Sequence, residues 1–428
     1  MTEDRDKAEL LNLQFQENFS QEDVSSIPFY NCTCPRMPEI TVSDHGRLKL
    51  LIGLNISKAI GPDEIHPRIL KEAASEIAPV LKYIFQKSLN SGTLPVDWRI
   101  ANICPIYKKG DKSAAINYRP ISLTSIICKL LEHIVCSNLT SHLDRNGIIT
   151  PRQHAFRKHR SCTTQLCTVI HDWCKAFDDG QQTDAFILDF AKAFDTVPHE
   201  RLKAKLYRYG VCGNTLKWID AFLCHRSQRV VINGAKSEWI HVSSGVPQGT
   251  VLGPILFNIF INDITDHIDS EIRLFADDCV CYRKIRSSDD CEVLQKDIHQ
   301  LGKWAKYWNM KFEPSKCKVI HITWKTRHKT CHLYFLNDTP LDTVTQIKYL
   351  GVTITNDLRW NYHVAEITKK ANQILGLLRR NLSACDCSVK KAAYIGLVRP
   401  LLEYASSAWD PYTDQLINEI EKVQRRAA

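Results

Sequence analysis

The chain has 428 residues, a length that favours roughly two to four modules over one small fold. Its 44% of hydrophobic residues supports a large core, and with 24% charged residues it is neither a disordered tail nor a fibrous chain. The net charge is +9, and residues 1–45 are acidic, so the remainder carries an excess of about +15 that suits a polyanionic partner.

No segment predicts a membrane span or a secretory signal. The most apolar stretch, residues 251–261, contains Pro254 and Asn258 and has about half the length that a bilayer requires. None of the Cys-x-Cys pairs has zinc-module spacing, so we expect the 17 cysteines to be thiols of a reducing compartment, nuclear or cytoplasmic. Several are expected to be buried small hydrophobes: Cys128, Cys136, Cys167, Cys212 and Cys224.

Residues 1–180 read as a lead-in followed by helices and two strands. Residues 1–47 are expected to be a linker with a loop-like centre. Apolar residues at helical spacing predict a helix over 67–89, which stops at Asn90-Ser91-Gly92. Strands are predicted at 98–111 and 117–123, and helical segments at about 126–135 and up to 179.

Residues 181–382 alternate between strands and helices. An apolar strand is predicted at 185–190, a helix from Pro198 to Gly210, and a hairpin over 228–242 around Asn233-Gly234. A loop rich in Gly and Pro then enters an apolar helix. The remaining predictions are a hairpin at 273–283, a helix at 294–308, strands at 316–324 and 345–354, and a basic helix over 362–382.

The sequence places carboxylates where two predicted strands end. Asp189 closes an apolar strand, and Asp277 and Asp278 lie at the tip of a predicted hairpin. A carboxylate in so apolar a setting costs free energy unless it is paired or binds a cation, and Mg²⁺ binds through one or two carboxylates, waters and phosphates. The alternative is that these aspartates are capping or solvated residues without a metal, because Asp is common in turns and at strand ends.

Seven motifs carry a resemblance to a known family. In order, NYRPISL, QHAFRKHRSC, AFILDFAKAFDTVPH, SGVPQGTVLGP, FADD, FEPSKCK and YLGV resemble the blocks of reverse transcriptases of non-LTR (LINE-type) retrotransposons, most of all the jockey-like branch. The resemblance runs from about residue 48 nearly to the end. It implies an α+β right-hand polymerase: fingers at 48–180, an antiparallel-sheet palm at 181–345, and a primer grip with a helical thumb at 346–428.

The resemblance also implies a metal site. Matched by position, Asp189, Asp277 and Asp278 are the catalytic carboxylates, and the backbone carbonyl of Phe190 is a further ligand of two Mg²⁺ ions, with Mn²⁺ as a substitute. Asp195, six residues after Asp189, is interpreted as structural or as a helix-start residue.

The nucleotide site is implied in the same way. Arg119, with either Lys108 or Lys109, is expected to bind the triphosphate, and Lys316 to lie near the leaving group or to be a solvated edge residue. Phe194 matches the side chain that excludes a 2′-hydroxyl, and its alternative is a core aromatic. Gln248 and Gly249 match the loop at the nascent base pair, where glycine allows a close backbone approach.

Two further segments are expected to contact the template and primer. Arg157, Lys158 and Arg160 are basic enough to meet template phosphates, although such a run is usually a solvated surface. Tyr349, Leu350 and Gly351 match the primer grip. Ala155 stands where relatives usually have Gly, which predicts a stiffer or shifted loop.

The expected activity is RNA-directed DNA polymerisation, a nucleotidyl transfer in which dNTPs are added to a DNA primer on an RNA template. The endonuclease domain of full-length relatives is expected to be absent. One rival is a catalytically inactive, domesticated remnant that binds nucleic acid, and another is a structural protein that binds none.

Overall fold

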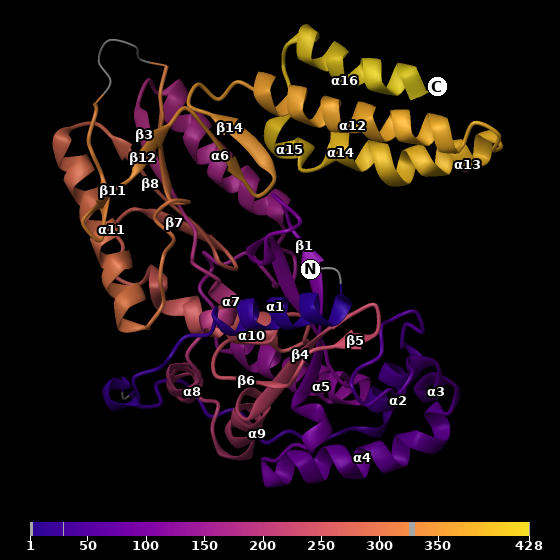
Figure 1. The fold of residues 1–428 in the computed structure, drawn as a ribbon. Coiled ribbons are helices and arrows are strands. Elements are labelled where there is room, and N and C mark those ends of the chain that lie inside the picture. Colours follow the sequence, from indigo (N-terminus) through magenta and orange to yellow (C-terminus); the bar gives the residue numbers. More distant parts are fainter. Residues whose placement is uncertain (1–2, 29, 325–329, 428) are drawn as a thin grey trace. The chain divides into compact units, whose positions relative to one another are not determined.

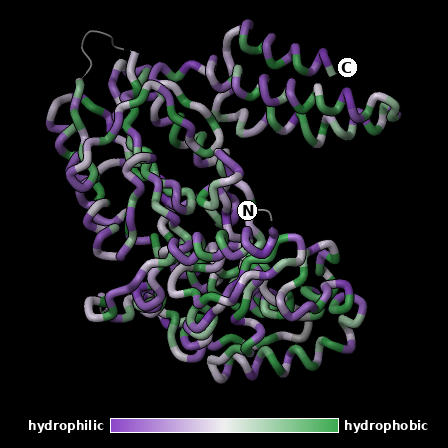
Figure 2. Tube along the Cα trace, viewed as in Figure 1, coloured by the Kyte–Doolittle hydropathy of each residue, from purple (hydrophilic) through white to green (hydrophobic). Residues whose placement is uncertain are grey.

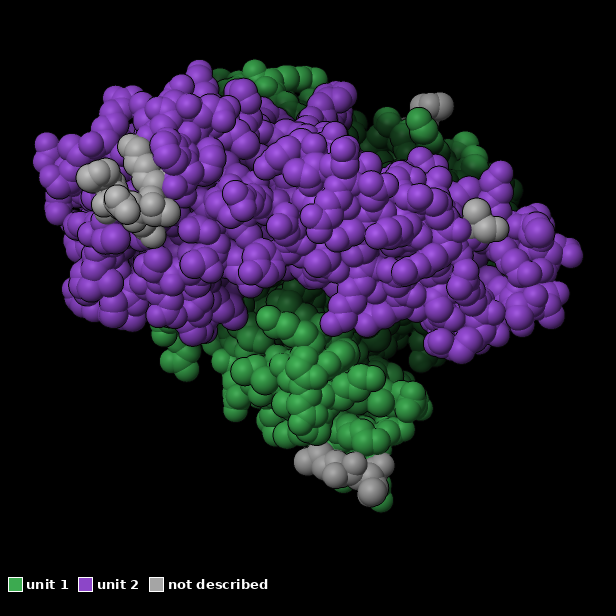
Figure 3. Space-filling model, turned by 90° about the horizontal axis from the view of Figure 1, so that it is seen from above, with its two compact units in different colours: residues 1–150, 190–264, 305–311 green, residues 151–189, 265–304, 312–428 purple. Residues whose placement is uncertain are grey.

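The computed structural model describes residues 3–28, 30–324 and 330–427 (Figure 1). They form two compact units, coloured separately in Figure 3. Unit 1 comprises residues 1–150, 190–264 and 305–311, and unit 2 comprises residues 151–189, 265–304 and 312–428. The chain therefore contributes separate segments to each unit, whereas the sequence predicted contiguous domains. Strand pairing between distant segments accounts for this difference, because paired strands belong to one unit wherever they lie in the chain.

Unit 1 contains a five-stranded sheet. Its order is β2 (Tyr118–Leu123), β1 (Ile100–Tyr107), β4 (Arg226–Ile232) and β5 (Ala235–Lys236), and β6 (Ile240–Val242) also pairs with β4. Strand β1 runs antiparallel to β2 and parallel to β4. The predicted Asn233-Gly234 turn is confirmed, because both residues have positive φ, at 49° and 87°, between two paired strand ends.

Helices complete unit 1. The helix predicted at 67–89 is divided at Ala73 into two pieces, and the second ends at Gly92, whose φ of 65° is typical of a helix C-terminus. The helices are α1 (Asp4–Gln16), α2 (Asp44–Ile52), α3 (Pro67–Glu72), α4 (Ala74–Ser91), α5 (Ile126–Arg145), α7 (Ala193–Thr196), α8 (His199–Arg208), α9 (Gly213–Leu223) and α10 (Gly253–Ile261).

The N-terminal segment is part of the core of unit 1, where the sequence predicted a linker. Ala8, Leu11 and Phe15 on one face of α1 pack with Ile103 of β1 and Val230 of β4. This apolar face contributes on the order of a few kcal/mol, since a fully buried Leu or Phe contributes about 1.5–3 kcal/mol.

Unit 2 contains a second five-stranded sheet. Its order is β12 (Asp342–Val344), β9 (Lys318–Ile322), β3 (Gln182–Leu188), β8 (Asp278–Ile285) and β7 (Glu271–Phe275). The central strand β3 is antiparallel to both neighbours and is buried along its whole length. Helix α6 (Cys162–Asp178) packs Trp173 and neighbouring apolar residues against Ala185 and Ile187 of β3.

Short hairpins and helices form the rest of unit 2, except that the last three residues of α11 belong to unit 1. The helices α12 and α16 alternate between hydrophobic and hydrophilic residues along their length, as packed surface helices do (Figure 2). The elements are α11 (Ser288–Tyr307), β10 (Phe335–Leu336), β11 (Thr339–Pro340), β13 (Gln346–Tyr349), β14 (Val352–Thr355), α12 (Asn361–Asn381), α13 (Cys387–Ala393), the π-helix Tyr394–Val398, α14 (Arg399–Glu403), α15 (Ser406–Trp409) and α16 (Asp414–Ala427).

Two predictions about composition can be compared with this fold. Among the described residues, no helix combines the length and the hydrophobicity that crossing a bilayer demands. All 17 cysteines lie in the described ranges and are free thiols. Of the five predicted to be buried, only Cys128 is fully buried, and the other four are half-buried at the edges of their helices and turns.

Candidate active site

The predicted catalytic carboxylates lie at one end of the sheet in unit 2. Leu188, the last residue of β3, pairs with Cys279 of β8, so the next position along each strand brings Asp189 beside Asp278. Asp277 occupies the two-residue turn between β7 and β8, since Phe275 pairs with Asp278. Directly opposed residues on neighbouring strands have Cβ atoms about 4.5–5.5 Å apart, so this register places Asp189 close to Asp278 at one end of the sheet, with Asp277 in the adjoining turn.

The surroundings of these carboxylates suit a hard cation. All three side chains are half-exposed, whereas Leu188 and Cys279 beside them are fully buried. Within residues 3–28, 30–324 and 330–427, no three His, Cys, Asp or Glu side chains are gathered into a ready-made metal site. Mg²⁺ does not require one, because it keeps several waters and takes one or two carboxylates together with substrate phosphates. The donor set therefore fits Mg²⁺.

Asp189 is held by the segment that precedes β9. Its carbonyl accepts a hydrogen bond of 2.8 Å from the Glu313 backbone N–H. Its carboxylate lies 3.6 Å from the ammonium of Lys316, and both side chains are partly exposed. Lys316 was predicted to bind the nucleotide, and the structure places it directly beside a predicted catalytic carboxylate. The side chain of Phe190, the next residue, is buried.

A buried glutamine braces the turn that carries Asp277. Gln153 is 1% exposed, and its side-chain oxygen accepts hydrogen bonds from the backbone N–H groups of Ala276, at 3.0 Å, and Ala155, at 2.9 Å. Its amide nitrogen lies 3.5 Å from the Ala276 carbonyl. Ala276 has a φ of 55°, a strained value for a residue other than glycine, so these bonds stabilise a turn that would otherwise relax. Nothing in the sequence around Gln153 indicated this role.

Gln153→Leu is therefore expected to lower the rate of primer extension, the activity that the resemblance implies, more than a comparable buried substitution does. It leaves two buried N–H groups without an acceptor, at a cost of about 1–3 kcal/mol each, and it releases the Asp277 turn. The matched control is Gln182→Leu, because Gln182 is also buried and bonds both backbone groups of Thr330. Both variants should melt at lower temperature. If Gln153→Leu and Gln182→Leu lost the same extension rate at equal folded fraction, Gln153 would have no specific role in the site.

The basic loop after Gln153 is tied to a buried histidine. One guanidinium nitrogen of Arg160 lies 2.6 Å from Nε2 of His154, and burial, reinforced by this charge, lowers the pKa of His154 to about 4. Lys158 is exposed and Arg157 half-buried. Ala155 is buried and has a negative φ, whereas the next residue, Phe156, has a φ of 56°. Ala155 therefore needs no glycine-like backbone conformation.

The predicted primer-grip residues form a tight turn in unit 2. Leu350 and Gly351 have φ values of 44° and 85° and connect β13 to β14. Tyr349 is 1% exposed, and its hydroxyl accepts a hydrogen bond of 3.0 Å from the buried amide of Gln165. Burial raises the pKa of Tyr349, and the nearby Asp278 adds to that shift. Tyr349 thus anchors the turn in the core near Asp278, Leu350 is partly buried against the same core, and Gly351 is exposed.

The predicted nucleotide residues of unit 1 lie on β2 and on the loop beside it. The backbone N–H of Ser122 donates a 2.8 Å hydrogen bond to the Gln248 carbonyl. Gly249 has a φ of 98°, and a Cβ there would lie 3.0 Å from the Ser122 carbonyl oxygen. Gly249 therefore lies close against the backbone of β2, and its predicted approach to the nascent base pair stays a prediction.

Two predicted phosphate ligands lie at one end of the β1–β2 hairpin. Arg119 pairs with Ile106, and the Lys108 N–H donates a 2.9 Å hydrogen bond to the Asn117 carbonyl. The side chains of Lys108, Lys109 and Arg119 are all exposed, so the structure leaves the choice between the two lysines open.

Phe194 is half-buried rather than fully buried. Its ring stacks on Phe257 of α10 with 4.5 Å between centroids and an angle of 18° between planes. The next residue, Asp195, accepts a 2.8 Å hydrogen bond from the Gln248 amide. Arg119 is close enough for its charge to favour the ionised form of Asp195. In unit 1 the four residues Arg119, Phe194, Asp195 and Gln248 therefore form one neighbourhood.

Arg119→Ala is expected to raise the nucleotide KM about ten- to hundredfold, since hydrogen bonds to charged groups contribute about 1.5–3 kcal/mol. Arg119→Lys should recover only part of this, because an ammonium keeps the charge and loses the planar, two-pronged geometry. Steady-state kinetics at varied dNTP concentration measures both. Full recovery by the lysine variant would show that Arg119 acts only as a point charge.

Comparisons with known proteins point to one family. Residues 106–354 match the family described as "Reverse transcriptase (RNA-dependent DNA polymerase)". The chain is 28% identical over 393 residues to the "Probable RNA-directed DNA polymerase from transposon BS" of Drosophila melanogaster, covering 87% of the chain and 43% of that protein. It is also 28% identical over 392 residues to the "RNA-directed DNA polymerase from mobile element jockey" of the same species, covering 88% of the chain and 42% of that protein. The chain thus spans less than half the length of these relatives.

Proposed function

The chain belongs to the reverse transcriptase (RNA-dependent DNA polymerase) family, and on this premise we propose that it extends a DNA primer by copying an RNA template. The predicted resemblance to non-LTR reverse transcriptases of the jockey-like kind is confirmed by the matched relatives. The observation that carries the proposed activity is the pairing of Leu188 with Cys279. This pairing brings Asp189 and Asp278 together at one end of the sheet, with Asp277 in the adjoining turn. We further propose the right-hand arrangement of fingers, palm and thumb for the whole chain.

In this proposal, Asp189, Asp277 and Asp278 hold divalent cations. Bound Mg²⁺ would lower the pKa of the primer 3′-hydroxyl and neutralise charge on the leaving pyrophosphate. The three half-buried carboxylates supply the negative charge that would bind these cations. Gln153 keeps the Asp277 turn in one conformation, so little rearrangement precedes each transfer.

The residues of unit 1 are proposed to bind the incoming nucleotide. Arg119 presents a planar cation to phosphate oxygens, and the Gln248–Gly249 backbone lies close against β2. Phe194, stacked on Phe257, presents a rigid ring to the sugar and so disfavours a 2′-hydroxyl. Template, primer and dNTP are the proposed partners, with phosphate contacts from the loop at residues 157–160.

Primer extension and a gel shift on the same RNA–DNA hybrid test this function. Extension that requires Mg²⁺ and dNTPs supports it. A hybrid that is bound with steep salt dependence and never extended would instead identify a nucleic-acid-binding remnant. A chain that neither binds nor extends the hybrid would match neither.

A further inference from the structure

A short N-terminal segment of unit 1, residues 19–26, contacts helix α7, which carries Phe194, and the 244–248 loop, which carries Gln248. We call this segment the strap. The backbone N–H of Ser20 donates a 2.8 Å hydrogen bond to the Ser244 hydroxyl, and the Ser20 hydroxyl donates one of 2.8 Å to the Thr196 carbonyl. One strap residue therefore bonds to α7 and to the 244–248 loop at once.

Helix α7 and the 244–248 loop are also bonded to each other. The Ser244 hydroxyl donates to the Asp195 carbonyl, and the Val246 N–H donates to the Phe194 carbonyl, both at 2.8 Å. Gly245 has a φ of 90°, and a Cβ there would lie 2.7 Å from the carbonyl oxygens of both Phe194 and Asp195. The backbone around Phe194 therefore has little freedom to move relative to the 244–248 loop.

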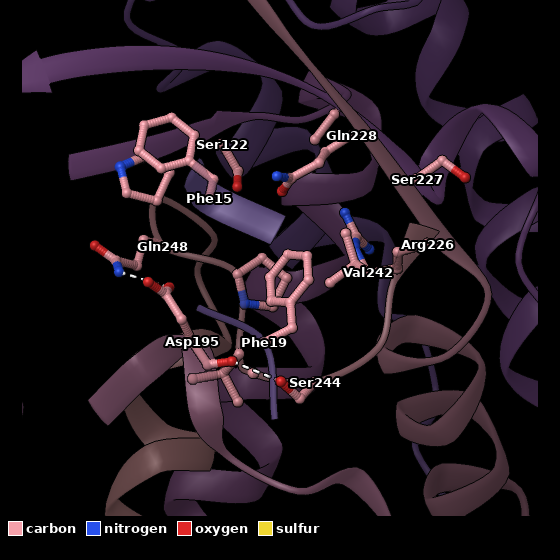
Figure 4. A pocket seen from close by; sticks show the side chains of 15 residues that line it. Phe15, Phe19, Ser122, Asp195, Arg226, Ser227, Gln228, Val242, Ser244 and Gln248 are labelled. Atoms are coloured by element: carbon pink, nitrogen blue, oxygen red, sulfur yellow. Dashed lines mark hydrogen bonds between the residues drawn. The ribbon is translucent and has the colours of Figure 1, made fainter. Parts of the chain in front are cut away.

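The Asp195 side chain sets the orientation of the Gln248 amide. An ionised carboxylate only accepts hydrogen bonds, so it selects the amide nitrogen of Gln248, at 2.8 Å, and turns the amide oxygen away (Figure 4). Burial raises the pKa of Asp195, while the Gln248 bond and the charges of Lys192 and Arg119 oppose that shift. Burial therefore disfavours the charge of the Asp195 carboxylate, a cost that an uncharged side chain at this position would not have.

We infer that Asp195 and Ser20 are positioning residues of the nucleotide site: Asp195 orients the Gln248 amide, and Ser20 of the strap holds helix α7, which carries Phe194, to the loop that carries Gln248. This inference rests on the proposed function. It assigns a role to an aspartate that the sequence marked as structural, and to a segment that the sequence marked as a linker.

The strap has its own anchor, which makes the inference testable. The Glu22 carboxylate accepts hydrogen bonds of 3.0 Å from the backbone N–H groups of Glu200 and Arg201 at the start of α8. It also pairs at 3.0 Å with the Arg201 guanidinium, and these two side chains are only 11% and 6% exposed. Loss of the Ser20 hydroxyl therefore leaves the strap attached.

Two aromatic side chains also pack near the Asp195–Gln248 bond. Phe15 and Phe19 line a cavity of about 30 Å³ that Asp195, Ser244 and Gln248 also border (Figure 4). This volume holds about one water molecule, so no nucleotide enters it. The two rings therefore pack beside the residues that form the Asp195–Gln248 bond.

The test compares four variants of the full chain: Asp195→Ala, Asp195→Asn, Ser20→Ala and the control Ser25→Ala. Ser25 lies in the strap but is exposed, and its hydroxyl bonds to Asp23 of the strap itself. The measurements are dNTP KM and kcat in RNA-templated extension, the preference for dNTP over rNTP, and the binding of a fluorescent dNTP analogue to the chain with a primed template.

Asp195→Ala is expected to raise KM and the analogue Kd about tenfold and to change kcat less than about threefold, as for one charge-assisted hydrogen bond. Asp195→Asn should recover part of the affinity, because its amide oxygen can still accept from Gln248. Ser20→Ala should raise KM a few-fold and narrow the preference for dNTP. Ser25→Ala should match the wild type, and the thermal midpoint of Asp195→Asn should not fall.

Unchanged KM and analogue Kd in Asp195→Ala, or an equal response of Ser20→Ala and Ser25→Ala, would overturn the inference while leaving the polymerase function intact. A wild-type chain that binds the analogue without extending the primer would count against the proposed function, and the Kd values would still decide the inference. A wild-type chain that neither binds nor extends would overturn both.

Discussion

Asp277→Asn is expected to reduce RNA-templated primer extension by roughly a thousandfold, as the loss of one preorganised electrostatic group at a transferring phosphoryl centre does. The substitution keeps the shape of the side chain and removes its charge. Asp277 lies in the β7–β8 turn, half-exposed and braced through Gln153, so the fold should tolerate the change.

The matched control for this variant is Asp338→Asn. Asp338 also occupies a two-residue hairpin turn in unit 2, between β10 and β11, and its side chain is exposed. Extension by this control should equal that of the wild type. If Asp277→Asn kept wild-type extension at equal folded fraction, the assignment of Asp277 as a metal-binding carboxylate would be wrong.

Phe194→Val is expected to raise the use of ribonucleotides relative to deoxyribonucleotides by roughly 10- to 200-fold, the range that a changed contact in an apolar pocket produces. The Phe194 ring stacks on Phe257, which fixes its plane, and the shorter valine leaves room for a 2′-hydroxyl. The measurement is the ratio of kcat/KM for matched rNTP and dNTP on one template.

The dNTP reaction of the same variant serves as its control. A core aromatic that only stabilises unit 1 would lose thermal stability on truncation, by about 3 kcal/mol or more for a fully buried ring, and the ratio would not change. The half-buried position of Phe194 predicts a smaller loss of stability and a large change in the ratio. An unchanged ratio in a folded variant would remove Phe194 from sugar selection.

Local periodicity was sufficient to predict most of the elements around the site. The apolar run at 185–190 and the Asp-Asp hairpin at 273–283 correspond to β3, β7 and β8 within a few residues. Their pairing was a hypothesis from the sequence, because hydrogen bonds between strands about ninety residues apart leave no periodic signal. The register of β3 against β8 confirms it.

The hydrogen bonds that support the site residues could not be predicted from the sequence. Gln153, Gln165 and Asp195 are polar residues whose partners lie far along the chain, and only the fold brings each pair together. Helix α1 is a different case. Its apolar Ala8, Leu11 and Phe15 are spaced for one helix face, but the loop-like segment that follows them, rich in Ser, Pro and Asn, suggested a linker.

The most direct test of the central claim is single-nucleotide incorporation by the purified chain on an RNA template with a DNA primer, with each dNTP offered alone. We expect that only the dNTP complementary to the next template base is added, and only with Mg²⁺ or Mn²⁺ present. A folded chain that binds the primed template and adds no nucleotide under these conditions would contradict it.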